Sequence, residues 1–167
     1  MAVDKMIMGV HHCFKGGTVV SRLDSLEKFA AIRELVRRAP VFQEIANLPA
    51  FEESVISREK LQSTGFGHGV AVAHGRSEAL ERVLIALGIS EPGIPFGAAD
   101  GQPVKLLFLI ASPASTTLDY LQALSNLVRV VRDCGLRSSL LSSEDNSVIE
   151  KTICDAFACS LERVGCP

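Results

Sequence analysis

The chain has 167 residues, of which 47% are hydrophobic and 22% are charged, and its formal net charge is −2. This composition excludes an intrinsically disordered chain, and the length favours one domain that spans residues 1–167. The 17 basic and 19 acidic residues form no basic stripe, so we expect no nucleic-acid partner.

The sequence also favours a protein of the cytoplasm. No apolar run approaches the roughly 18 residues of a membrane-spanning helix, and the N-terminus lacks the pattern of a signal peptide. The odd number of cysteines predicts no disulfide framework and fits a reducing compartment. They stand at Cys13, Cys134, Cys154, Cys159 and Cys166.

The first 40 residues predict short strands and then a helix. Residues 1–20 hold apolar pieces broken by a histidine pair and a glycine pair, which indicates one or two strands and a turn. Apolar residues then recur at helical spacing over residues 28–39. We expect Asp24 or Ser25 to cap this helix and Pro40 to end it.

A second helix is expected over residues 49–61, because proline suits the first turn of a helix. A short strand follows at residues 69–73, where valine alternates with alanine. Four apolar side chains of the helix are expected to face the core, namely Phe51, Val55, Ile56 and Leu61.

Two apolar runs predict further strands, at residues 83–87 and 104–111. The second run is nearly continuous and lies between Pro103 and Pro113, which suits a central strand that is buried on both faces. Helices, strands and then helices in this order favour an α/β sandwich with a mixed sheet.

The remaining chain predicts helices. Residues 115–133 show amphipathic helical spacing, and we expect Gly135 to end this helix. Residues 136–141 and 147–161 are expected to supply one or two more helices.

Residues 64–76, with the sequence TGFGHGVAVAHGR, hold the most informative motif. Their glycines precede a strand, whereas a dinucleotide-binding loop follows one, so that class is excluded. The strand at 69–73 is expected to end at His74 and Gly75. Since histidine titrates near neutrality, an exposed imidazole here predicts a nucleophile, although an ordinary loop histidine fits the same spacing.

Two sequence blocks resemble a known family. The first is REKLQSTGFGHGVAVAHGR, from Arg58 to Arg76, and the second is GIPFGAADGQPVKLLFLIASP, from Gly93 to Pro113. In this order they resemble the fructose/mannitol-type enzyme IIA domains of the bacterial sugar phosphotransferase system. The nitrogen-regulatory IIA proteins are the nearest subgroup, and the similarity covers roughly residues 25–160.

The resemblance implies a three-layer-like α/β sandwich, in which α-helices flank a mixed central β-sheet. It implies a phosphotransferase that carries a phosphoryl group on His74, received from a phosphohistidine carrier protein of the HPr type. Neither a cofactor nor a metal is implied. The phosphoryl group would pass to a IIB protein, or its presence would regulate a target such as a kinase or transporter.

The resemblance also assigns roles to residues around His74. Arg58 matches the family arginine near the phosphoryl group, and a planar guanidinium suits phosphate oxygens. Thr64 matches a family hydroxyl that orients the imidazole or donates to the phosphate. Arg76 keeps a basic residue of the family, and Glu59 is expected to pair at the surface.

The chain departs from the family pattern in several places. Ala73 stands where proline is usual, His68 stands where asparagine is usual, and Tyr120 occupies the position of a second family histidine. A phenol can hydrogen-bond the His74 imidazole, but it cannot carry a positive charge. The alternative prediction is therefore a degenerate regulatory binding module without phosphotransfer.

A metal site is the third possibility. His11, His12 and Cys13 form a local cluster that His68 or His74 could join, and zinc takes such ligands. Adjacent residues rarely all point at one ion, so a metal-free polar segment is favoured.

Overall fold

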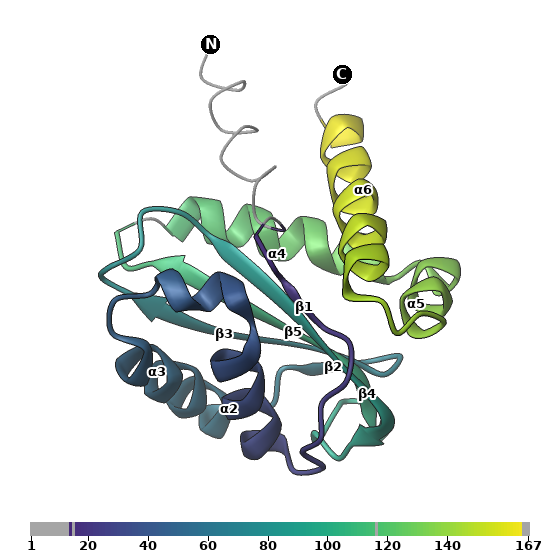
Figure 1. The fold of residues 1–167 in the computed structure, drawn as a ribbon, viewed down its shortest axis with the longest axis horizontal. Coiled ribbons are helices and arrows are strands. Elements are labelled where there is room, and N and C mark those ends of the chain that lie inside the picture. Colours follow the sequence, from purple (N-terminus) through teal and green to yellow (C-terminus); the bar gives the residue numbers. More distant parts are fainter. Residues whose placement is uncertain (1–13, 15, 116, 165–167) are drawn as a thin grey trace.

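The computed structural model describes residues 14, 16–115 and 117–164 (Figure 1). The cluster at residues 11–13 therefore lies outside the described residues, as does most of the segment 1–20 for which the sequence predicts strands. The described part of that segment contains one short strand, β1 (Val19–Val20).

A mixed sheet forms the middle layer of the described chain. Its strands follow the order β1-β4-β5-β3-β2. β5 pairs in parallel with β3 and antiparallel with β4, and its burial on both faces confirms the central strand predicted from the apolar run. The other strands are β2 (Gly65–Gly67), β3 (Val70–Ser77), β4 (Leu84–Ile94) and β5 (Val104–Pro113).

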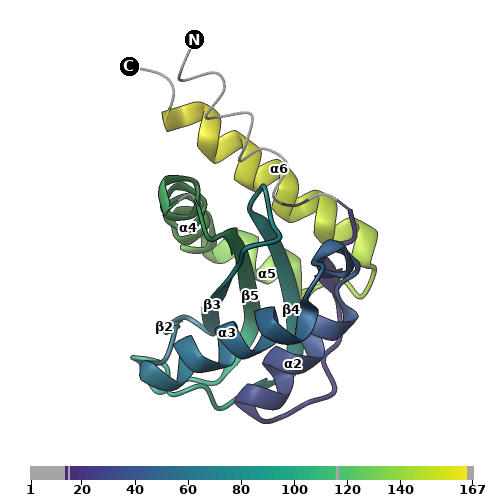
Figure 2. The same ribbon diagram turned by 90° about the vertical axis from the view of Figure 1, so that its left-hand side faces the viewer.

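Helices cover both faces of this sheet, which confirms the layered fold (Figures 1 and 2). One face packs against α2 (Lys28–Arg38), the 3₁₀ helix η1 (Pro40–Glu44) and α3 (Leu48–Leu61). The other face packs against α4 (Thr117–Val131), α5 (Cys134–Leu141) and α6 (Asn146–Val164). None of these described helices has the length and apolar character that a membrane crossing requires.

Helix α3 is close to its predicted bounds. Asn47 caps it by accepting a hydrogen bond from the Ala50 N–H at 3.2 Å. Three of its four predicted core residues are buried, but Leu61 is 83% exposed, so that prediction was wrong. At about 100° per residue, Leu61 lies about 140° around the helix from Ile56, which removes it from the buried face.

Gly135 does not end the helix before it, contrary to the sequence prediction. α4 ends at Val131, and Gly135 lies inside α5. Asp133 causes the break, because its carboxylate accepts the Leu136 N–H at 2.8 Å and so caps a new helix.

Strand β3 divides its side chains between the two helical layers. Ala71 and Ala73 belong to the core on the α3 side, whereas Val70 and Val72 belong to the core on the α4 side. Because side chains alternate along a strand, His74 continues the second set and faces α4.

Candidate functional site

His74 lies within β3 and not at the end of a strand. The ladder with β5 pairs His74 with Ile110 and continues to Ser77 opposite Pro113. The expectation that β3 ends at His74 and Gly75 was therefore wrong, because the longer β5 supplies pairing partners beyond them. As a result the His74 side chain is half-buried.

Tyr120 of α4 covers the imidazole. The ring centroids of His74 and Tyr120 are 4.8 Å apart, and the two planes meet at 37°. The sequence anticipates a hydrogen bond between these groups, whereas the contact in the structure is between two tilted rings. Such a contact restricts the orientation of the imidazole.

Burial lowers the pKa of His74, and the positive charges of Arg58 and then Arg76 lower it further. The carboxylate of Glu59 opposes this shift to a smaller extent. At neutral pH the imidazole is therefore uncharged, and one ring nitrogen keeps a free lone pair for nucleophilic attack.

The same two arginines act on Tyr120. Burial raises the pKa of the Tyr120 phenol, while Arg58 and Arg76 partly offset this rise. The phenol stays protonated near neutral pH. Four of the residues singled out from the sequence therefore share one electrostatic environment, to which α3, β3 and α4 each contribute.

Arg58 and Arg76 are held by different neighbours. The Arg58 Nη1 donates to the Gln62 carbonyl at 3.1 Å, so the guanidinium lies over the end of α3. The Arg76 backbone N–H donates to the Ser54 Oγ at 2.9 Å, while its side chain is exposed. Each guanidinium retains donors that a phosphate can use.

The contacts of Thr64 and Glu59 differ from those expected from the sequence. The Thr64 hydroxyl donates to the Glu59 carboxylate at 2.6 Å, and the Thr64 N–H donates to the other oxygen at 3.0 Å. The resemblance implies that the Thr64 hydroxyl contacts His74 or the phosphate, but in the structure this hydroxyl donates its proton to Glu59. Glu59 is only 2% exposed, so its predicted pairing at the surface was wrong. Its cationic partner, Lys28, lies 31 positions earlier, beyond the reach of a local motif.

Two further candidates from the sequence are His68 and a metal site. His68 is exposed in the turn between β2 and β3, with φ of 57°, and its N–H donates to Asp100 at 2.9 Å. Within the described ranges, no group of three or more His, Cys, Asp or Glu side chains is placed to hold a metal ion.

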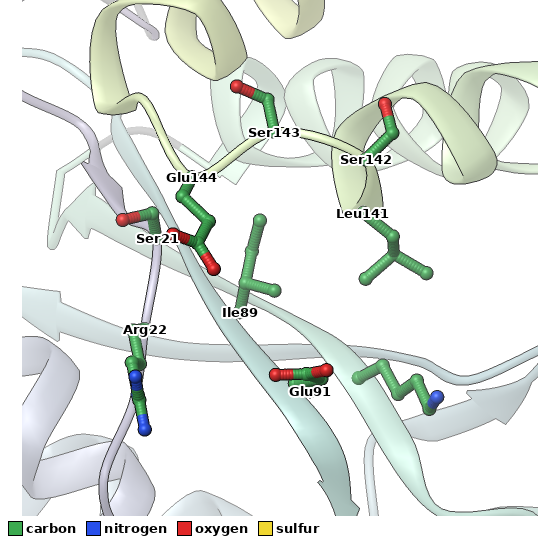
Figure 3. A pocket seen from close by; sticks show the side chains of 9 residues that line it. Ser21, Arg22, Ile89, Glu91, Leu141, Ser142, Ser143 and Glu144 are labelled. Atoms are coloured by element: carbon green, nitrogen blue, oxygen red, sulfur yellow. The ribbon is translucent and has the colours of Figure 1, made fainter.

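A hollow elsewhere on the surface involves none of the residues predicted for the site (Figure 3). Its volume is about 370 Å³. Arg22 and Lys105 are balanced there by Glu91 and Glu144, so its charge selects neither an anion nor a cation.

Gly75 allows α3 to approach the strand that carries His74. A Cβ at this position would lie 2.6 Å from Val55 Cγ2, 2.9 Å from Ser54 Oγ and 3.1 Å from Phe51 Cε2. We predict that Gly75→Ala lowers the free energy of unfolding by about 1–3 kcal/mol, because the helix must shift. Urea denaturation measures this loss.

Gly135→Ala is the matched control for that substitution. Gly135 lies in α5, and its added Cβ would meet only the Asp133 carboxylate, at 3.1 Å. Alanine there should leave stability unchanged or raise it, since glycine is a poor helix former. Equal losses in the two variants would contradict the proposed close packing at Gly75.

Comparison with known proteins identifies the family. Residues 13–155 match the family described as "Phosphoenolpyruvate-dependent sugar phosphotransferase system, EIIA 2". The chain belongs to this family. The resemblance stated from the two sequence blocks is thereby confirmed, and membership supports a phosphocarrier role for this EIIA chain.

Its relatives include regulatory and sugar-specific proteins. A nitrogen regulatory protein of Bradyrhizobium diazoefficiens is 35% identical over 122 residues, which cover 73% of this chain and 79% of that protein. The fructose-specific EIIABC component of Bacillus subtilis is 31% identical over 132 residues, which cover 79% of this chain. The match spans only 21% of that longer protein.

Solved structures agree on the fold. The nitrogen regulatory protein IIA-Ntr of Neisseria meningitidis superposes with a TM-score of 0.74 at 26% identity, covering 86% of this chain and 98% of that one. The mannitol IIA of Escherichia coli gives a TM-score of 0.69 at 18% identity, covering 82% and 96%. The α/β fold predicted for an EIIA domain is thus confirmed.

Proposed function

We propose that this EIIA chain accepts a phosphoryl group on His74 from a phosphohistidine carrier protein of the HPr type. The observation that carries the proposal is the state of the imidazole. It is half-buried against Tyr120 and kept uncharged by burial and by the charges of Arg58 and Arg76. An uncharged imidazole beside two cations suits attack on an anionic phosphoryl group.

The transfer requires little covalent chemistry from the protein. A lone pair of the His74 imidazole attacks phosphorus, a new N–P bond forms, and the N–P bond to the donor histidine breaks. The bonding electron pair returns to the donor imidazole. Arg58 and Arg76 offset the charge on the phosphoryl oxygens during this step.

The partner requires an accessible surface beside His74. Leu118 and Leu121 lie on the same helix as Tyr120 and are 57% and 51% exposed. At about 100° per residue they project away from the Tyr120 side of α4, toward its outer surface. Exposed large apolar side chains favour contact with another protein, so these leucines support a partner contact along the outer side of α4.

The phosphoryl group has two possible destinations. An Escherichia coli mannitol IIA has been solved in complex with phosphorylated IIB, and several relatives of this chain are nitrogen regulatory proteins. We propose that phosphorylated His74 either passes its group to a IIB protein or signals to a regulatory target such as a kinase or transporter.

The direct test is reconstitution. The chain is incubated with phosphoenolpyruvate, the first enzyme of the system and HPr, and acid-labile phosphate is located by mass spectrometry of peptides. Phosphate on His74 is the expected result. Absence of label, while a known EIIA protein is labelled in parallel, would overturn the proposal.

One observation favours the second candidate, a binding module without transfer. Tyr120 covers the imidazole with a phenol that stays neutral, so it supplies no positive charge to a phosphoryl group. In that case a regulatory partner would bind the unlabelled chain, and the same reconstitution would yield no phosphohistidine.

Tyr120 substitutions test the ring contact. Tyr120→Ala should slow transfer about two- to tenfold, because an aromatic contact contributes about 0.5–1.5 kcal/mol to holding the imidazole. Tyr120→Phe keeps the ring and should stay within about twofold of the wild-type rate. Quench-flow transfer from phosphorylated HPr measures both rates. If phenylalanine were as harmful as alanine, the hydroxyl and not the ring face would be the important group.

A further inference from the structure

Glu59 is a buried carboxylate that the proposed transfer does not use directly. Its side chain is 1% exposed, and its Oε1 lies 2.7 Å from the Lys28 Nζ. Burying a charge is unfavourable unless it is paired and hydrogen-bonded. The contacts of Glu59 offset this penalty, and they show which parts of the fold the carboxylate joins.

Lys28 satisfies the charge from the neighbouring helix α2. Its Nζ also donates to the Phe96 carbonyl at 3.2 Å and lies 4.9 Å from the centroid of the Phe96 ring. The ammonium is therefore surrounded by a carboxylate, a carbonyl and an aromatic face. This ion pair uses Oε1 alone, and both oxygens of Glu59 make further contacts.

Those contacts connect α3 to the strand of His74. Both oxygens of Glu59 bind Thr64, one through the N–H and one through the hydroxyl. The Thr64 carbonyl in turn accepts the Val72 N–H at 3.2 Å. The end of α3 is thus joined to β3 two residues before His74.

Arg58 lies in the same turn of α3. It directly precedes Glu59, and its Nη1 bonds the Gln62 carbonyl just beyond the helix. A shift of this turn would therefore move the Arg58 guanidinium relative to His74.

We propose that Glu59 is a positioning residue, which sets Arg58 against His74 by fixing the end of α3 to β3 through Thr64. This inference rests on the proposed phosphoryl transfer for its functional meaning. Its geometric content, the placement of Arg58 beside His74, can be measured independently of any transfer.

Glu52 is a carboxylate on the same helix whose role is purely structural. Its Oε2 lies 3.0 Å from the Arg37 Nε, and its Oε1 lies 3.5 Å from the Arg33 Nε. It joins α3 to α2, as Glu59 does, but it lies about two turns earlier and its ion pairs are with α2 alone. Glu52 therefore provides the matched control.

The test removes the carboxylate without leaving a buried charge behind. Lys28→Met with Glu59→Ala deletes both ions, because loss of one partner alone strongly destabilises a protein. Lys28→Met with Glu59→Gln retains hydrogen-bonding groups for Thr64. The first double variant should slow transfer from phosphorylated HPr about tenfold or more, since small displacements of catalytic groups are costly. The second should recover most of the rate.

The pKa of His74, measured by NMR titration, separates positioning from loss of charge. Removal of the Glu59 charge alone would lower the pKa of His74, because that charge raises it. Displacement of Arg58 would instead raise the pKa of His74 toward its value in Arg58→Ala. We expect a rise in the Lys28→Met/Glu59→Ala variant and none in Glu52→Ala.

The outcomes are distinguishable. An unchanged or lowered pKa of His74 in a folded Lys28→Met/Glu59→Ala variant overturns the positioning role. A rise in that pKa without any labelling of the wild-type chain supports the positioning role and refutes the proposed transfer. Equal losses of transfer rate in Glu52→Ala would show general destabilisation and also overturn the inference.

Discussion

Replacement of His74 by alanine is expected to abolish the incorporation of acid-labile phosphate. No other imidazole in the described part of the chain lies within the environment of Arg58, Arg76 and Tyr120, since the remaining one, His68, is in an exposed turn. Loss of the nucleophilic nitrogen removes the atom that the proposed reaction phosphorylates. Intact-protein mass spectrometry after reconstitution measures the result.

His68→Ala is the control for this substitution and should be labelled like the wild type. We expect His74→Ala to keep the fold but to lose some stability. Because His74 is half-buried against Tyr120, alanine should lower the free energy of unfolding by about 0.5–1.5 kcal/mol. Full labelling of the His74→Ala protein would place the phosphoryl acceptor elsewhere.

The fold was predictable where a single segment carries its own signal. The apolar run that became β5 is nearly continuous and lies between two prolines, which suits a strand covered on both sides. Helix α3 was readable from its spacing and from Pro49 in its first turn. The error at Gly135 arose because two signals compete there, and the cap at Asp133 prevails over the glycine.

The residues of the candidate site are a prediction from the sequence, and their geometry was not predictable from it. The motif predicts a role for His74, but the length of β3 depends on pairing with β5, which lies about 36 positions further along the chain. Likewise nothing local to Glu59 indicates Lys28 as its partner. Burial and register arise from contacts between distant segments, so a motif read along the chain does not contain them.

Substitution of Arg58 by alanine is expected to slow phosphoryl transfer to His74 about 100-fold, a size typical for loss of one group that stabilises transition-state charge. It should also raise the pKa of His74, because the Arg58 charge lowers it. The His74 imidazole is then protonated at a higher pH than in the wild type, and a protonated imidazole has no lone pair for attack on phosphorus. The loss of rate should therefore grow as the pH falls below neutrality. Transfer rates across pH and an NMR titration of the imidazole measure both effects.

Arg37→Ala separates these effects from the general loss of a cation. Arg37 is exposed and paired with Glu52 on the α2 side of the sheet, so its removal should leave the rate and the pKa of His74 unchanged. Arg58→Lys keeps the charge but loses the planar fork, and it should therefore preserve the pKa of His74 better than the rate. A normal rate in Arg58→Ala would mean that the guanidinium shapes the titration of His74 without contacting the phosphoryl group, and the charge compensation would then fall to Arg76.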